Sequence, residues 1–432
     1  MATTAVRGHA ISFRGDPFAD DDAFVDIEDA VIVCEDGRIA AVGPYGRTAV
    51  PDGVQVDHYP DGLICAGFVD AHIHYVQTGI IGAFGARLID WLNMHTYVEE
   101  QRFADRAYAD TVARIFFDQL LANGTTTAVT FAAVYAGSVD AFFEESQRRG
   151  MRMIGGKVLM DRNAPGALLD TAQRGYDDSK ALIARWHDNG RNLYAITPRF
   201  APTSSPEQLE LAGALWKESP GTYVHTHVSE NVDEVRWVRE LFPHRADYLD
   251  VYDHYGLLGR RCVLAHGVHL TERERARIHE TGSAVAHCPT SNLFLGSGLF
   301  DLHAAKDRRR PLNIGLGTDI GAGTSFSLLQ TMNEAYKVAK LTASPLDARR
   351  SFYLATLGGA RALDVADQIG SLEVGKEADL VVLDTKATPL LAYRSERAET
   401  TDELMFVLAI MAGVRSVAAT YVAGEPAYVR PA

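Results

Sequence analysis

The sequence is poor in cysteine. Its 432 residues include only four, Cys34, Cys65, Cys262 and Cys288, and no two of them form a Cys-x-x-Cys pair. Cysteines so far apart argue against a disulfide framework and against a zinc site built on thiolates. We therefore expect a protein of a reducing compartment.

Long hydrophobic runs are also missing. The longest, Leu404 to Val414, has eleven residues, too few for a helix to cross about 30 Å of hydrocarbon. The first twenty residues alternate polar and apolar side chains and lack the hydrophobic stretch of a secretory signal. These absences favour a soluble, cytoplasmic protein that does not bind a membrane.

Basic residues are fewer than acidic ones. Lysine and arginine number 42 against 56 acidic residues, which gives a net charge of -14. A chain of this charge repels nucleic acid and anionic membrane surfaces, whereas it can bind a small, weakly charged ligand. With 47% hydrophobic and 23% charged residues, the composition is that of a globular protein and excludes disorder as the main state.

The two ends of the chain are predicted to form β structure. Alternating apolar residues between positions 24 and 44 flank Asp36-Gly37, a dipeptide that tolerates positive φ in a hairpin. Near the other end, 380–383 is a continuous apolar run, and 417–429 folds back through 423–425. Neither end could bury a core alone, so we predict that residues 1–62 and 369–432 form one small β-sheet domain.

The middle of the chain, residues 63–368, has a different pattern of apolar and polar residues. Apolar runs of strand length end in polar residues and alternate with stretches of helical periodicity, such as 105–121, 139–149 and 326–341. This alternation is typical of βα units, and eight such units form a barrel ringed by helices. We predict an α/β fold, a (β/α)8 TIM-like barrel, with strands at residues 63–74, 125–134, 152–161, 193–202, 223–230, 262–270, 284–292 and 312–320.

Four histidines and an aspartate fall at the predicted strand ends. His72 and His74 end the first strand, His227 the fifth, His266 the sixth and Asp319 the eighth. The carboxyl ends of barrel strands meet on one face, which carries the active site. Residues two apart on a strand project to the same side, so His72 and His74 can bind one ion. Three imidazoles and one carboxylate suit zinc or iron(II), with a position left for water.

Other histidines and one lysine need separate interpretation. An isolated His-x-His pair is usually coincidence or a core pair, and only the joint placement of five residues favours a metal. His225 forms such a pair with His227 but lies deeper on the strand, so we interpret it as a core histidine; His269 and His287 stay ambiguous. Lys157 could bridge two metals if carboxylated, but it falls too deep on the third strand. We therefore predict one metal ion per chain.

Glu230 is a candidate catalytic carboxylate. It follows His227 by three residues, where the fifth predicted strand runs into a loop. It could be a solvated loop charge or a helix N-cap. An unliganded carboxylate beside a metal-activated water is what general acid and base catalysis requires, and we favour this role.

Several strings of residues carry a family resemblance. Gly-Phe-Val-Asp-Ala-His-Ile-His at 67–74, Gly-Thr-Asp at 317–319 and Gly-Lys-Glu-Ala-Asp-Leu at 375–380 resemble the amidohydrolase superfamily. Longer strings are similar to the guanine deaminase family within it, and the similarity spans essentially the whole chain: HIHYVQTGIIGAFGARLIDWLN (72–93), RFAPTSS (199–205), THVSEN (226–231), HCPTSNLFLGSGLF (287–300) and GLGTDIGAGTSFSLLQTMNEAYKV (315–338).

The resemblance implies a hydrolase that converts guanine to xanthine and ammonia, and a homodimer. The implied ligands of one zinc ion are His72, His74, His227 and Asp319. The groups that would handle the water and its protons are Glu230, His266 and Asp319. The implied purine contacts are Gln77, Arg199 and Phe200, with Gln77 and Arg199 as hydrogen-bond donors and Phe200 as an apolar wall.

Some alternatives stay open. Val76 stands where the family usually has proline, which leaves the placement of Gln77 in doubt. An enzyme of the same architecture acting on another oxidised purine, a pterin or a triazine would keep the metal ligands and change only the contacts. The intact ligand set disfavours an inactive scaffold. The glycines at 315–323 lack the spacing of a dinucleotide-binding loop, which disfavours an oxidoreductase.

Overall fold

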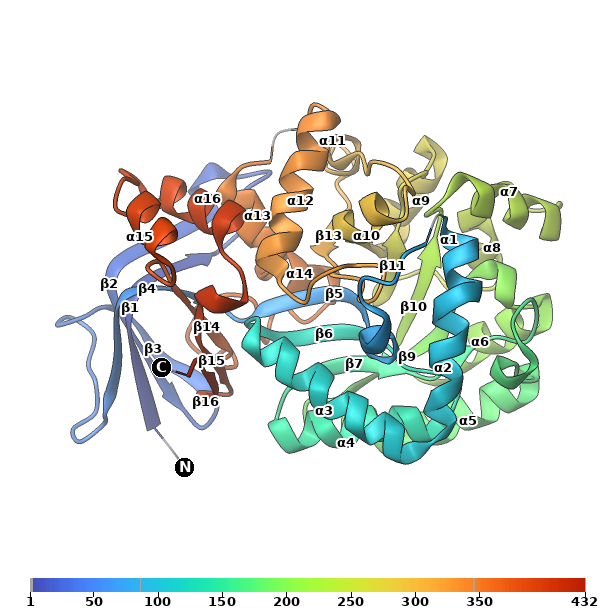
Figure 1. Ribbon diagram of the computed structural model, residues 1–432, viewed down its shortest axis with the longest axis horizontal. Coiled ribbons are helices and arrows are strands. Elements are labelled where there is room, and N and C mark those ends of the chain that lie inside the picture. Colours follow the sequence, from blue (N-terminus) through green and yellow to red (C-terminus); the bar gives the residue numbers. More distant parts are fainter. Residues whose placement is uncertain (1–2, 86, 345, 432) are drawn as a thin grey trace.

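Two sheets organise the molecule (Figure 1). The computed structural model describes residues 3–85, 87–344 and 346–431. One sheet is a nearly closed parallel barrel ringed by helices, and the other is a mixed sheet that unites strands from both ends of the chain. The predicted fold class, an α/β (β/α)8 TIM-like barrel with a small β sheet from the two terminal segments, is confirmed.

The small sheet contains β1 (Thr3–Phe13), β2 (Phe24–Glu35), β3 (Arg38–Pro44), β4 (Val56–Ala66), β14 (Leu380–Asp384), β15 (Val417–Val422) and β16 (Glu425–Val429). Their order is β16-β15-β14-β4-β1-β2-β3. Only β1 and β4 run parallel; the other neighbours are antiparallel. The predicted hairpin at Asp36-Gly37 joins β2 to β3, and both residues have positive φ.

The barrel strands are β5 (Phe68–His74), β6 (Thr125–Phe131), β7 (Arg152–Gly156), β8 (Val158–Leu159), β9 (Leu193–Pro198), β10 (Tyr223–Val228), β11 (Cys262–His266), β12 (Ala284–His287) and β13 (Asn313–Leu316). They pair in parallel from β5 to β13, and β8 continues β7 along β9. The ring closes where the N–H of Asp319, just beyond β13, donates to the carbonyl of His72 at 2.9 Å.

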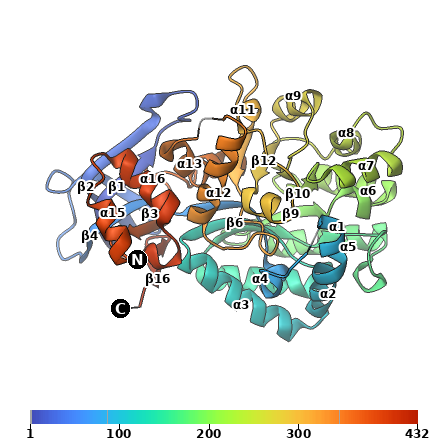
Figure 2. The same ribbon diagram turned by 45° about the horizontal axis from the view of Figure 1, so that its top comes forward.

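Helices surround the barrel and flank the small sheet (Figures 1 and 2). Two short ones follow β5: α1 (Leu88–Trp91) and α2 (Tyr97–Glu100). The others are α3 (Arg106–Ala122), α4 (Ala136–Arg149), α5 (Ala172–Trp186), α6 (Pro206–Glu218), α7 (Val232–Leu241), α8 (Tyr248–His254), α9 (Glu272–Thr281), α10 (Pro289–Phe294), α11 (Leu302–Ala305), α12 (Leu328–Leu341), α13 (Ala348–Leu354), α14 (Leu357–Ala362), α15 (Pro389–Ser395) and α16 (Thr401–Met411). Within the described ranges, no helix is long and apolar enough to cross a membrane.

Local sequence explains where these helices begin and which face they bury. Asp105 accepts a hydrogen bond from the N–H of Ala107 and so caps α3, which buries Phe116 and Phe117 against the barrel. A capping box of Thr271 and Glu274 starts α9 in the same way. Such side chains satisfy N–H groups that have no partner in the first helical turn.

Except for the first strand, which ends at His74 as predicted, the predicted strands run too long at their carboxyl ends. The first is divided: residues 63–66 belong to β4 of the small sheet, and the barrel strand begins at Phe68. The seventh ends at His287, and α10 occupies residues 289–294. The eighth ends at Leu316, so Asp319 lies in a loop. Hydrophobicity failed to mark these ends because the loops beyond them are buried as well.

A cluster of ion pairs ties the barrel to the segment that enters the small sheet. Glu377, just before β14, pairs with Arg152 and Arg191 at 2.5 Å each, and Arg191 also reaches Asp379 at 2.5 Å. All four side chains are at most 16% exposed. The boundaries predicted at 62/63 and 368/369 stay a prediction, and we propose that this cluster fixes the two units together.

Replacing Glu377 by alanine is expected to destabilise the fold by about 3–5 kcal/mol, because it leaves two largely buried guanidinium groups short of a partner. Urea unfolding followed by circular dichroism measures the change. Glu373→Ala is the control: Glu373 pairs with Lys376 but is 45% exposed, and such a pair contributes about 0–1 kcal/mol. An unchanged urea midpoint in Glu377→Ala would contradict the role of the cluster.

Candidate active site

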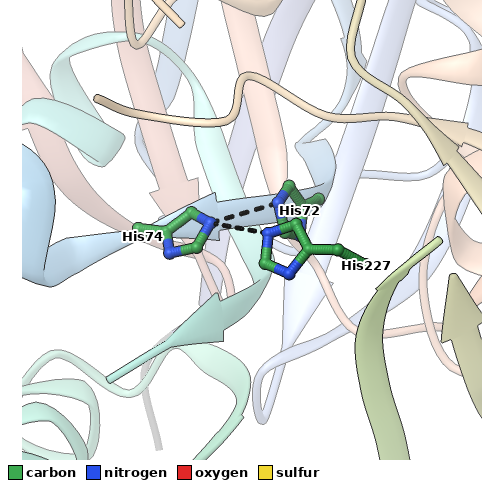
Figure 3. A group of neighbouring side chains, drawn as sticks. All are labelled: His72, His74 and His227. Atoms are coloured by element: carbon green, nitrogen blue, oxygen red, sulfur yellow. Dashed lines mark hydrogen bonds between the residues drawn. The ribbon is translucent and has the colours of Figure 1, made fainter. Parts of the chain in front are cut away.

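Histidines converge at the carboxyl ends of the barrel strands, as predicted. β5 carries His72 and His74, and β10 carries His227. The Nε2 atoms of His72 and His74 are 3.2 Å apart, and those of His74 and His227 are 3.3 Å apart (Figure 3). Asp319 joins them, with Oδ1 3.1 Å from His72 Nε2 and 3.3 Å from His74 Nε2. The structure therefore brings all the predicted metal ligands together.

This group fits a divalent metal ion. Two nitrogens bound about 2.1 Å from one tetrahedral ion lie about 3.4 Å apart, close to the separations found between these imidazoles. Burial lowers the pKa of His74 to about 3, and it lowers the pKa values of His72 and His227 as well. The imidazoles are therefore neutral, as metal binding requires.

Hydrogen bonds on the far side of two rings orient them. Nδ1 of His227 lies 2.7 Å from the backbone carbonyl of Arg199. A carbonyl can only accept, so Nδ1 carries the proton and the Nε2 lone pair faces the cluster. Nδ1 of His72 lies 2.8 Å from Nε2 of buried His225. His225 is thus the hydrogen-bonded core histidine we predicted, but sequence reasoning missed that it orients a candidate ligand.

Glu230 is buried beside this group. Its Oε2 lies 3.5 Å from Nε2 of His266, and its Oε1 accepts a hydrogen bond from Ser297 at 2.9 Å. Burial raises the pKa of Glu230 to about 8, and the charge of Asp319 adds to this effect. It is neither a solvated loop charge nor an N-cap, because it is 3% exposed and Asn231 caps α7.

His266 and the backbone around it are held in place from several sides. Its Nδ1 lies 2.9 Å from Oδ1 of Asn292, and its Nε2 lies 3.7 Å from Asp319. His266, Asp319 and Ser229 all have φ between +48° and +72°. Non-glycine residues in this left-handed region are uncommon and gather at functional sites, where the surrounding structure enforces them.

The predicted purine contacts line the same pocket as Glu230 and three of the candidate metal ligands, His74, His227 and Asp319. Gln77, Arg199 and Phe200 all face it. The rest of its wall is mostly apolar: Leu88, Trp91, Leu92, Leu295 and Ala322. Gln77 reaches the pocket with Val76 buried beside it in the sequence, so the missing proline does not displace Gln77. A flat, weakly polar molecule suits such walls.

Glu100 is a site residue that sequence reasoning missed. Its Oε2 accepts a hydrogen bond from Nη1 of Arg199 at 2.6 Å, and its Oε1 accepts one from Nε2 of Gln77 at 3.2 Å. No pattern in the sequence marks it, because Glu100 stands among the polar residues of a short stretch that resembles an exposed surface. Only the fold shows that its side chain is fully buried.

The residues left ambiguous by the sequence have partners of their own. Nε2 of His269 lies 2.8 Å from the carbonyl of Ser297, and His287 stacks on Phe300 with ring centroids 4.7 Å apart. The buried ammonium of Lys157 forms an ion pair with Asp170.

Comparison with known proteins agrees with this geometry. The family model described as "Amidohydrolase family" matches residues 63–427. The chain is 52% identical to the guanine deaminase of Escherichia coli over 94% of its length and 92% of the relative's. It is 40% identical to a probable guanine deaminase of Deinococcus radiodurans, covering 96% of each chain.

Comparison with solved structures finds similarity to the same kind of protein. The chain superposes on E. coli guanine deaminase with a TM-score of 0.95 and 49% identity over the whole of both chains. A guanine deaminase of C. acetobutylicum, solved with guanine bound in its active site, gives a TM-score of 0.87 at 28% identity, covering 98% of this chain and 100% of that one. The chain belongs to the amidohydrolase family, and these relatives within it are guanine deaminases.

Proposed function

We propose that this protein is a metal-dependent hydrolase that converts guanine and water to xanthine and ammonia. The observation that carries the proposal is that one pocket is lined by three of the four candidate metal ligands, by the buried carboxylate of Glu230 and by the polar side chains of Arg199 and Gln77. Residues that could activate water and residues that could hydrogen-bond to the edge of a purine thus face the same pocket. The substrate named for the relatives is the one that fits this combination.

We further propose zinc as the metal, with iron(II) as the alternative that the same donors accept. His72, His74, His227 and Asp319 would hold it. When bound, such an ion lowers the pKa of a water ligand toward 7 and makes it a nucleophile at neutral pH.

The chain's own residues would move the protons. Glu230 accepts a proton from the attacking water and delivers it to a ring nitrogen of guanine, while the water oxygen bonds to C2. Nε2 of His266, 3.5 Å from Glu230 and 3.7 Å from Asp319, lies between these two carboxylates and helps to hold the attacking water. Asp319 accepts the second proton and passes it to the amino group, and the bond from C2 to this nitrogen then breaks. Ammonia and xanthine are the products.

Phe200 and the apolar wall would hold the ring plane, while Arg199 and Gln77 would hold the polar edge. The test is to incubate the purified protein with guanine, adenine, a pterin and an amino-substituted triazine, and to measure ammonia and the ring product. We expect equal amounts of xanthine and ammonia from guanine, with a much higher kcat/KM than for the others. A higher kcat/KM for any other ring would overturn the proposed substrate.

One tightly bound metal ion per chain is expected on elemental analysis of the purified protein. His72→Ala and Asp319→Ala should each lose the ion and the activity, because each removes one of the four proposed ligands. His279→Ala is the control, since that imidazole is exposed on α9 and bonds to the carbonyl of Pro311. Two equivalents of metal per chain, or full activity in both ligand variants, would contradict a single metal site.

We also propose that the protein is a homodimer, as the family resemblance implies. Light scattering on the purified protein tests this directly. A mass of one chain at micromolar concentration would contradict it.

A further inference from the structure

One buried carboxylate joins the two polar side chains that face the proposed purine. Glu100 is 0% exposed. Its Oε2 accepts from Arg199 at 2.6 Å, and its Oε1 accepts from Gln77 at 3.2 Å. Arg199 and Gln77 line the pocket, whereas Glu100 lies behind them. Each oxygen of Glu100 therefore serves one of the two contact residues.

The ion pair between Arg199 and Glu100 determines which hydrogen-bond donors Arg199 presents to a ligand. Burial acts to lower the pKa of Arg199, but the charge of Glu100 and its hydrogen bond, together with Tyr97 and Asp319, outweigh it and the net pKa is raised, so the guanidinium stays charged. Glu100 engages one end of the guanidinium through Nη1, and Tyr97 lies under it with 5.4 Å between Cζ and the ring centroid. The remaining N–H groups are free of Glu100 and can donate to a neutral carbonyl oxygen.

Glu100 also affects the orientation of the Gln77 amide, that is, whether its nitrogen or its oxygen faces the carboxylate. The oxygen and nitrogen of an amide are told apart by their partners. A carboxylate can only accept, so the Gln77 nitrogen must face Glu100, and its oxygen accepts the N–H of Gly321 at 3.1 Å. The carboxylate of Glu100 and the N–H of Gly321 therefore favour the same orientation from the two ends of the amide, and the Gln77 nitrogen also lies 3.1 Å from Nδ1 of His74.

We propose that Glu100 is a specificity-determining positioning residue, which holds Arg199 and Gln77 so that the pocket selects purines with a 6-oxo group over purines without one. The ligand class rests on the proposed function. The groups that carry the selection are the fixed donors of Arg199, which a 6-oxo oxygen can accept from and a 6-amino group cannot.

Glu100→Gln tests this, because a neutral amide of the same shape has one acceptor oxygen for two donors. The probes are hypoxanthine, which has the 6-oxo group but no amino group to lose, and adenine. We expect the dissociation constant of hypoxanthine to rise about tenfold, the size of one lost hydrogen bond, while that of adenine changes little. For guanine, KM should rise more than kcat falls.

Glu99→Gln is the matched control. Glu99 is the preceding residue of α2, is 6% exposed and bonds to Arg102 and Tyr108 rather than to pocket residues. It should keep the wild-type preference. Glu100→Asp is the second variant, in case the glutamine variant does not fold: it keeps the charge but is too short to reach both partners, so the preference should also shrink.

An unchanged ratio of hypoxanthine to adenine affinity in either folded variant would overturn the role of Glu100. Failure of the proposed function looks different. In that case the wild-type protein itself would release no ammonia from guanine, whatever the purine affinities of the variants.

Discussion

Glu230→Gln is expected to lower kcat on guanine by about 10²- to 10⁴-fold, the range that general acid and base groups contribute. The glutamine keeps the shape of the side chain and its hydrogen bond with Ser297, but it cannot take a proton from water. Metal content and the dissociation constant of hypoxanthine should therefore stay near wild type. Steady-state kinetics and elemental analysis on the same preparation make the comparison.

Asp233→Asn provides the control for that experiment. Asp233 lies in the first turn of the neighbouring helix α7, is 40% exposed and pairs with surface arginines. Loss of its charge should leave kcat unchanged. If Glu230→Gln keeps half of the wild-type rate, the proton transfer belongs to another group.

Arg199→Ala is expected to lower kcat/KM on guanine by about 10- to 100-fold, the equivalent of one hydrogen bond from a charged donor. Its effect on adenine should be smaller, since a 6-amino group cannot accept from the guanidinium. The preference for guanine should therefore shrink. The measurement is kcat/KM for both purines in both proteins.

Removal of Arg199 also leaves Glu100 without its ion-pair partner, so folding must be tested separately. Arg199→Lys keeps the positive charge beside Glu100 but loses the planar fork of donors. It should fold as the wild type does and still lose part of the preference. If both variants lose activity while the preference for guanine is unchanged, Arg199 is structural and another group reads the 6-position.

The barrel and the histidine and aspartate group could be predicted because both follow regular patterns in the sequence. Strand-length apolar runs alternate with helical stretches, and polar residues such as His74 and His266 stand at strand ends. These patterns involve residues that are close together in the sequence, and such residues stay together within one strand or helix. The boundary at Asp319 was placed wrongly because the loop that carries it is as buried as the strand before it.

The sequence could not predict contacts that depend on the whole fold. Glu100 has no motif of its own and meets Arg199, which lies 99 residues away in the chain. The bond between His225 and His72 spans 153 residues, so the local pattern showed a core histidine but not its partner. Gln77 and Arg199 were predicted only as donors to a ligand, and the structure shows that each is also bonded to Glu100.

In the proposed reaction, water replaces the amino group of guanine in this pocket. The most direct test is to let the purified protein act on guanine in oxygen-18 water and to analyse the ring product by mass spectrometry. We expect xanthine with one labelled oxygen, at C2, and one ammonia released per xanthine. Xanthine without the label, or unchanged guanine after incubation with metal-loaded protein, would contradict it.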